Sequence, residues 1–259
     1  MNKKTKKFIQ VAILISVIIT IIVNSLANVL PINNKTTQAL SDALPNLFVP
    51  AGITFAIWGV IYILLILFAI YQAKDLFKKD KNETKFVEKI GVLFIISCFF
   101  NILWIFLWHY EQVALSLLVM IGLFISLLMI YLKLEIGKTK ASLKEKIFVN
   151  LPFSVYLGWI TVATIANVTA FLVKINWDAF GIEPQIWTML VIIVVTIITI
   201  LIIIRRNDYA YSTVIIWALL GIYIKRSTDQ LEIANMTIIS IITILIVIIL
   251  SILFKYKKR

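Results

Sequence analysis

Cysteine, histidine and charge are all scarce in this chain of 259 residues, which has one cysteine, one histidine and only 15% charged residues. The single Cys98 excludes an internal disulfide and a cysteine-based metal cluster. His109 lies at an outer helix end beside Glu111, and because one His and one Glu make a poor metal site, we interpret it as an interfacial histidine. Neither a P-loop nor a dinucleotide-binding glycine motif is present. These absences exclude most thiol, metal and nucleotide chemistry, so we expect no cofactor and no metal, and an enzymatic activity is not favoured.

Hydrophobic residues dominate instead, at 61% of the chain with a mean hydropathy of +1.01. Soluble domains average roughly 45–50% apolar residues, so the composition predicts an all-α, polytopic integral membrane helix bundle. Apolar runs long enough to cross a bilayer, at about 20 residues each, occur about eight times. They are Phe8–Leu30, Ile53–Gln72, Ile90–His109, Val113–Leu132, Phe148–Leu172, Trp187–Ile204, Tyr209–Ile224 and Leu231–Phe254. The seventh is the shortest.

The basic residues are divided unequally between the segments that connect these runs. The two termini and alternate connections hold 21 Lys and Arg residues, including Lys78, Lys79, Lys81, Lys258 and Arg259, against 4 on the other side. Cytoplasmic loops carry the excess of Lys and Arg. The net charge of +12 therefore reflects membrane topology, not nucleic-acid binding. It predicts a multi-pass protein of a bacterial plasma membrane with both termini in the cytoplasm.

The first run has one alternative interpretation, as a cleaved signal peptide. Ser25-Leu26-Ala27 resembles a small-residue cleavage site. The apolar stretch before it is longer than the 7–15 residues usual for a signal sequence. We therefore predict an uncleaved first helix.

Polar and aromatic residues inside the predicted helices gather at one depth. At 1.5 Å per residue, Trp58, Trp104 and Asn167 each lie roughly 8 Å below the outer boundary, beneath the outer segment Pro31–Pro50. Residues three, four or seven apart share a helix face. Such faces hold Phe55, Trp58 and Tyr62 on the second helix, Asn101, Trp104 and Trp108 on the third, and Tyr156, Trp159 and Asn167 on the fifth.

Each of these residues also has a structural interpretation. Trp and Tyr commonly anchor helices at the membrane interface, which suits Trp108, Trp177 and Trp187. Trp58 and Trp104 lie deeper, where core packing is the alternative to a pocket. The asparagines, including Asn24 in the first helix, could serve as interhelical hydrogen-bond partners. The functional hypothesis is a ligand pocket with aromatic walls and a few polar groups that fix orientation.

These motifs resemble the translocator protein or tryptophan-rich sensory protein family. Its second helix carries proline, Phe, Trp and Tyr in order, matched by Pro50, Phe55, Trp58 and Tyr62. Its third helix carries Asn-x-x-Trp, matched by Asn101 and Trp104. Its fifth carries Tyr-x-x-Trp and then Asn eight residues on, matched by Tyr156, Trp159 and Asn167. The match covers about residues 8–175, and it departs from the family pattern at Ala51, Ile66 and Val155.

The resemblance implies a five-helix translocator-type binding bundle over residues 1–175 and a three-helix membrane extension over residues 176–259. It further implies that a hydrophobic planar ligand of the porphyrin class binds inside the bundle, and that a homodimer can form. The candidate ligand-binding residues are Trp58, Tyr62, Asn101, Trp104, Tyr156, Trp159 and Asn167.

Three functions remain open from the sequence. The first is binding, with sensing or transport, of a porphyrin-like ligand. The second is secondary transport of a small amphipathic solute, which the lack of charge well inside any span disfavours because coupled transporters commonly place ionisable groups there. The third is a membrane scaffold without a ligand.

Overall fold

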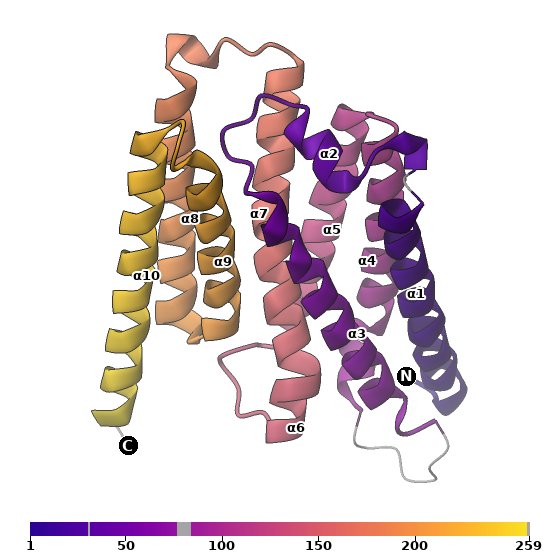
Figure 1. Cartoon of the computed structure of the whole chain (residues 1–259). Coiled ribbons are helices and arrows are strands. Elements are labelled where there is room, and N and C mark those ends of the chain that lie inside the picture. The colour runs from indigo at the N-terminus through magenta and orange to yellow at the C-terminus, as the bar shows by residue number, and fades with distance from the viewer. Residues whose placement is uncertain (31, 77–83, 258–259) are drawn as a thin grey trace.

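Long helices run up and down along one common direction (Figure 1). The computed structural model describes residues 1–30, 32–76 and 84–257, and within these ranges it is 83% helical with no strand. Pro31 and the basic residues Lys78, Lys79, Lys81, Lys258 and Arg259 lie outside the described residues. The α-helices are α1 Lys3–Val29, α2 Thr37–Asp42, α3 Ile57–Ala73, α4 Phe86–His109, α5 Val113–Lys133, α6 Leu143–Glu145, α7 Leu151–Lys174, α8 Pro184–Arg206, α9 Tyr209–Arg226 and α10 Leu231–Lys257. Short helical turns are η1 Ile32–Asn34, η2 Gly52–Ala56, η3 Lys146–Asn150 and η4 Ala179–Gly181.

The predicted all-α membrane bundle is confirmed. Seven helical segments of the described chain are long and apolar enough to cross a membrane, and they coincide with seven of the expected runs. The remaining run, around Tyr209–Ile224, is α9, which has 18 residues. At 1.5 Å per residue it spans about 27 Å, slightly less than the hydrocarbon core of about 30 Å. It packs against α7, α8 and α10 within the bundle.

Helix α7 lies between two groups of helices. On one side it packs against α3 and α5, which together with α1 and α4 form the first group. On the other side it packs against α9, which joins α8 and α10 (Figure 1). Its residues from Pro152 to Val162 are all buried. α7 is therefore the long helix of the first part that packs on the last three, and α9 also contacts η2.

Both termini lie at the same end of the bundle (Figure 1). Because successive helices alternate in direction, the described basic residues of the larger group lie at this end. Lys35, Lys174, Lys225 and Arg226 lie at the opposite end. The arrangement agrees with the charge division in the sequence, and the assignment of the basic end to the cytoplasm stays a prediction.

Two adjacent polar residues form the tight turn between α8 and α9. Asn207 takes a left-handed conformation with φ of 51°, which asparagine tolerates better than most residues. Asp208 then caps α9 by accepting from the Tyr211 amide at 3.1 Å, and its other oxygen accepts from the Ser154 hydroxyl of α7 at 2.7 Å. The turn therefore fixes the start of α9 against α7.

Gly158 allows α7 and α9 to approach each other closely. A β-carbon at this position would lie 3.1 Å from the Tyr211 carbonyl oxygen and 3.1 Å from the Val214 β-carbon. Small residues at such crossings let helix backbones come together and gain packing energy in a membrane.

The connection between α1 and α3 folds over the end of the bundle opposite the termini (Figure 1). We call residues 36–51 of this connection the roof segment. It begins with Thr36, whose hydroxyl accepts from the Ala39 amide at 3.2 Å and caps α2. Leu40, Phe48 and Val49 are buried. The roof segment is thus packed onto the helices beneath it.

Replacing Gly158 with valine should destabilise the protein, because the added methyl groups collide with α9. We expect a loss of about 1–3 kcal/mol in the free energy of unfolding, as is typical of overpacked cores, measured by thermal unfolding in detergent. Gly59→Val is the matched control, since nothing lies within 4 Å of a β-carbon there. Equal losses in both variants would contradict the close α7–α9 contact.

Candidate functional site

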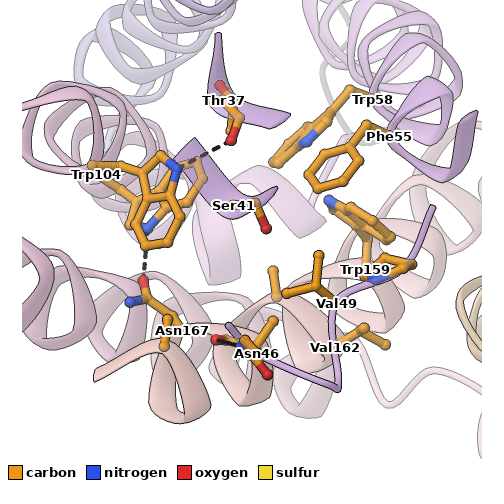
Figure 2. A pocket seen from close by; sticks show the side chains of 15 residues that line it. Thr37, Ser41, Asn46, Val49, Phe55, Trp58, Trp104, Trp159, Val162 and Asn167 are labelled. Carbon is orange, nitrogen blue, oxygen red and sulfur yellow. Dashed lines mark hydrogen bonds between the residues drawn. The ribbon is translucent and has the colours of Figure 1, made fainter. Parts of the chain in front are cut away.

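A cavity lies directly beneath the roof segment, between α3, α4 and α7. Its volume is about 50 Å³, and its wall includes four tryptophans (Figure 2). A second cavity of about 250 Å³ lies beside it and shares Thr37, Phe55 and Trp58 with the first. The three shared residues therefore border both spaces.

Trp58 is the centre of the aromatic wall. Its ring stacks on Tyr62 at 5.6 Å between centroids. It meets Tyr156 and Trp159 edge to face, each at 6.2 Å, and Phe55 meets Trp159 edge to face at 5.9 Å. Offset-stacked and edge-to-face pairs are the favourable aromatic arrangements. Residues of α3, η2 and α7 are thus joined into one aromatic cluster.

A chain of hydrogen bonds runs behind this cluster. The Asn24 side-chain amide of α1 donates to the Asn101 oxygen at 2.7 Å, and the Asn101 amide of α4 donates to the Tyr156 hydroxyl of α7 at 2.9 Å. All three side chains are buried. Asn101 therefore connects α1 with α7 through both ends of its amide.

A second polar chain lies nearer the roof segment. The Trp104 indole donates to the Asn167 side-chain oxygen at 2.9 Å (Figure 2). The Asn167 amide donates in turn to the Ser116 hydroxyl of α5 at 3.2 Å. Trp104 also stacks on Trp108 at 5.8 Å, and the Trp108 indole donates to the Thr37 carbonyl of the roof segment at 3.3 Å. The indole N–H groups of Trp104 and Trp108 therefore both have acceptors.

Trp159 differs from these two tryptophans. Its indole N–H is buried and has no hydrogen-bond partner among the described residues, although the residue is part of the cavity wall. A buried donor without an acceptor costs about 1–3 kcal/mol. Trp159 therefore carries, beside the cavity, a donor that the described protein leaves unsatisfied and that a ligand with an acceptor atom could satisfy.

The structure gathers the seven predicted site residues into one region but divides them by environment. Trp58, Trp104, Trp159 and Asn167 line the first cavity, and Tyr62 lines the second. Asn101 and Tyr156 line neither of these two cavities and instead hold each other behind the aromatic wall. The interhelical hydrogen bonding that the sequence left open as an alternative is therefore observed for Asn24, Asn101 and Asn167.

Two interfacial residues are placed differently from the sequence interpretation. Trp108, interpreted as a membrane anchor, is buried and lines the first cavity. His109, interpreted as an interfacial histidine, is fully buried, and its ring lies 2.7 Å from the Ile105 carbonyl oxygen and 3.5 Å from the Thr37 hydroxyl. The reason is α2, which covers this end of α4. The i, i+4 spacing from Trp104 is the sequence signal that could have assigned Trp108 to the pocket.

The roof segment contributes side chains that the sequence did not single out. Thr37, Ser41, Asn46 and Val49 all line the first cavity (Figure 2). Asn46 also donates to the Thr169 hydroxyl at 2.7 Å and to the Ala166 carbonyl at 3.2 Å, both on α7. Within the described residues, no group of three or more His, Cys, Asp or Glu side chains comes together.

Comparison with known proteins identifies a family but no individual relative. The family model described as TSPO-like protein matches residues 10–251. The match includes the roof segment, both cavities and α8 to α10, and so extends well beyond residue 175. No curated protein and no solved structure matches the chain.

The buried hydrogen bonds of Asn101 should contribute more to stability than those of an exposed asparagine on the same network. Asn101→Leu leaves Asn24 and Tyr156 without this partner, so we expect a loss of about 1–2 kcal/mol, seen as a lower thermal midpoint in detergent. Asn28→Leu is the control, because Asn28 is exposed and donates only to the Asn24 carbonyl. Equal thermal midpoints for the two variants would mean that Asn101 does not hold α1 to α7.

Proposed function

Because the chain belongs to the TSPO-like family, we propose that it binds a hydrophobic planar ligand of the porphyrin class beneath the roof segment. The observation that carries this proposal is the cavity with tryptophan walls and one unpaired indole donor, on Trp159. The protein is a multi-pass membrane protein. Its location in a bacterial plasma membrane, with cytoplasmic termini, is proposed from the division of basic residues.

The chemistry of the wall suits a flat, apolar ring that carries a few polar atoms. Trp58, Trp104 and Trp159 present ring faces and edges on which another aromatic system can pack. The Trp159 N–H offers a hydrogen bond to a carbonyl or carboxylate oxygen. Among the described residues, neither cavity is lined by Asp, Glu, Lys or Arg. This supports a largely apolar ligand and argues against coupled transport of an ion through the same space.

The first cavity is too small for a porphyrin-sized ligand in the form described, with a volume of about 50 Å³. Pockets for drug-sized ligands have about 300–1,000 Å³. Movement of Thr37, Phe55 and Trp58 would join the first cavity to the second, of about 250 Å³. We infer that a porphyrin-sized ligand binds an open form in which the two spaces are one.

Binding alone is the core of the proposal, and sensing and transport are its two possible consequences. None of the residues discussed is assigned a catalytic role. A homodimer stays a prediction from the family resemblance.

Removing the unpaired donor should weaken binding of protoporphyrin IX to the protein in lipid nanodiscs. Followed by the ligand's own absorbance, the wild-type protein should give saturable, one-site binding. Trp159→Phe should raise the Kd by about 5–10-fold, the worth of one hydrogen bond. Trp187→Phe is the control, because the Trp187 indole donates to the Ala179 carbonyl at 2.8 Å and does not line the first cavity. Linear, non-saturating uptake, equal in all three proteins, would mean that the ligand only partitions into the bilayer.

A further inference from the structure

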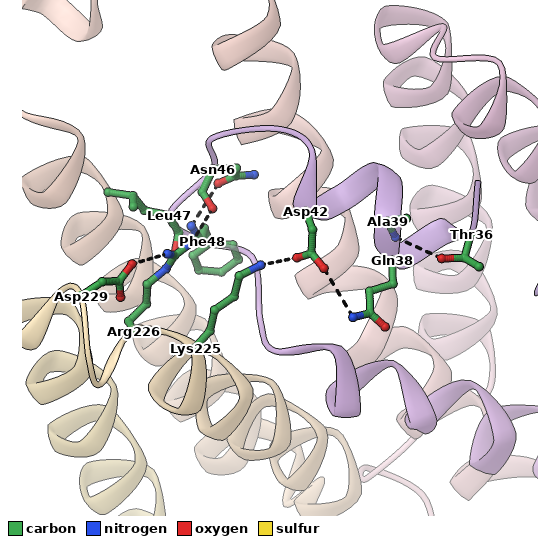
Figure 3. Close-up of polar contacts among 10 residues, drawn as sticks. All are labelled: Thr36, Gln38, Ala39, Asp42, Asn46, Leu47, Phe48, Lys225, Arg226 and Asp229. Atoms are coloured by element: carbon green, nitrogen blue, oxygen red, sulfur yellow. Dashed lines mark hydrogen bonds and ion pairs between the residues drawn. The ribbon is translucent and has the colours of Figure 1, made fainter. Parts of the chain in front are cut away.

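The roof segment is held from outside by the end of α9, which does not line either cavity beneath it. The Arg226 guanidinium donates from Nη2 to the Asn46 carbonyl at 2.9 Å and from Nε to the Leu47 carbonyl at 3.1 Å (Figure 3). Arg226 is only 8% exposed. One planar side chain thus binds two consecutive peptide carbonyls of the roof segment, 180 and 179 residues away in the sequence.

Two ion pairs strengthen this attachment. Asp229 accepts from Nη1 of Arg226 at 2.9 Å and so orients the guanidinium toward the roof segment. Lys225 forms an ion pair with Asp42, the last residue of α2 (Figure 3). Asp42 and Lys225 are both partly exposed, whereas the Arg226 contacts are largely buried. The attachment therefore has a buried part and a surface part that can be altered separately.

The α9 helix also holds the chain where the roof segment leads into α3. The Ala51 amide donates to the Gly221 carbonyl at 2.9 Å, and the Trp217 indole donates to the Thr54 carbonyl at 2.9 Å. A β-carbon on Gly221 would lie 2.0 Å from the Thr54 hydroxyl oxygen. The contacts of α9 thus run from Asp42 at one end to Thr54 at the other.

Asn46 connects these outer contacts with the cavity. Its backbone carbonyl accepts from Arg226, while its side chain donates to Thr169 and Ala166 of α7 and lines the first cavity. A change in the Arg226 contact therefore acts directly on a residue of the cavity wall. No contact between α9 and a ligand is needed.

We propose that the end of α9 is a latch that holds the roof segment closed over the cavity, with Arg226 as the positioning residue. In this role the C-terminal helices set how often the cavity opens. The part that concerns ligand entry rests on the function proposed above, whereas the closing of the roof segment does not. Lysine could not replace Arg226 fully, because a single ammonium lacks the planar fork that reaches two carbonyls at once.

Opening can be measured without any ligand by cysteine labelling. Val162 lies on α7 beneath the roof segment, lines the cavity and is 2% exposed. A Val162→Cys substitution in a Cys98→Ala background should react with a water-soluble maleimide only when the roof segment opens. Native Cys98, 4% exposed and in α4, reports global unfolding when the same latch variants are made without Val162→Cys. The protein is reconstituted in nanodiscs for both measurements.

We expect Arg226→Gln to raise the labelling rate at Val162→Cys by about tenfold or more, since hydrogen bonds from a charged donor are lost. Arg226→Lys should restore part of the protection. Lys174→Gln is the control for removal of one positive charge at this end of the bundle, and it should leave the rate unchanged. An unchanged rate in Arg226→Gln, with Cys98 unreactive, would overturn the latch.

The surface ion pair gives a second test that does not depend on a buried side chain. Lys225→Asp should raise the labelling rate by about two- to fivefold, and adding Asp42→Lys should bring it back toward wild type. If Cys98 becomes reactive in Arg226→Gln, that variant has unfolded. The test of the latch then rests on the Lys225 and Asp42 variants alone. No increase in Lys225→Asp, or no recovery in the double variant, then overturns the proposal.

Measuring protoporphyrin IX binding in the same variants distinguishes the latch proposal from the proposed function. The association rate of protoporphyrin IX should rise in each variant that raises the labelling rate. If labelling rises and the ligand shows no saturable binding to any form of the protein, the latch stands and the proposed ligand is wrong. If saturable binding is present but the association rate is the same in the wild-type protein and the latch variants, the ligand does not enter beneath the roof segment.

Discussion

Asn101 meets a requirement that the bilayer imposes on every buried polar group of the bundle. In hydrocarbon no water is available, so a buried amide must find its partners within the protein. Asn101 does so by accepting from Asn24 on α1 and donating to Tyr156 on α7. Lipid offers no hydrophobic gain when helices associate, so packing and such bonds decide their positions. The pairing ties α7, which packs on α3 and α5, to α4, and Trp159 and Trp104 lie on opposite sides of the cavity (Figure 2).

The same requirement gives Trp159 its significance. The Trp104 and Trp108 indoles both have acceptors, and the hydrogen-bonded asparagines beside them show that this region can supply partners where they are needed. Among the described residues, the Trp159 N–H group is buried without a partner, unlike the indoles of Trp104 and Trp108. A ligand that brings an oxygen removes the cost of this unpaired donor, and a pure hydrocarbon does not. Under the proposed function, the cavity would discriminate by the polar edge of a ligand as well as by its shape.

Much of this arrangement is visible in the sequence because helical spacing is a local property. The apolar runs predict the helices, and the i, i+3, i+7 faces bring Trp58, Trp104 and Asn167 to one depth and one cavity. Depth alone cannot reveal that α2 folds over the end of α4, so Trp108 and His109 are interpreted as interfacial when they are buried. The spacing of residues along one helix likewise cannot show which side chains on other helices are their hydrogen-bond partners.

The contact between Arg226 and the roof segment is the least predictable feature of all. It joins two short segments far apart in the sequence, and its acceptors are backbone carbonyls, which leave no residue pattern. In the charge count, Arg226 and Lys225 are only two of the 4 basic residues on the minority side. The three-helix membrane extension, which the sequence places outside the binding bundle, supplies through the end of α9 the contacts of Arg226 and Lys225 with the roof segment.

This arrangement explains how helices that never touch a ligand can control its binding. When only an open form admits the ligand, the apparent affinity equals the intrinsic affinity multiplied by the fraction of open molecules. Each 1.4 kcal/mol by which the α9 contacts favour the closed form then lowers the apparent affinity about tenfold. Contacts such as that of Arg226 with the Asn46 carbonyl are therefore as much a part of the binding equilibrium as the tryptophans. If the latch acts as proposed, the last three helices belong to the site, although the walls of both cavities are built from the first part of the chain.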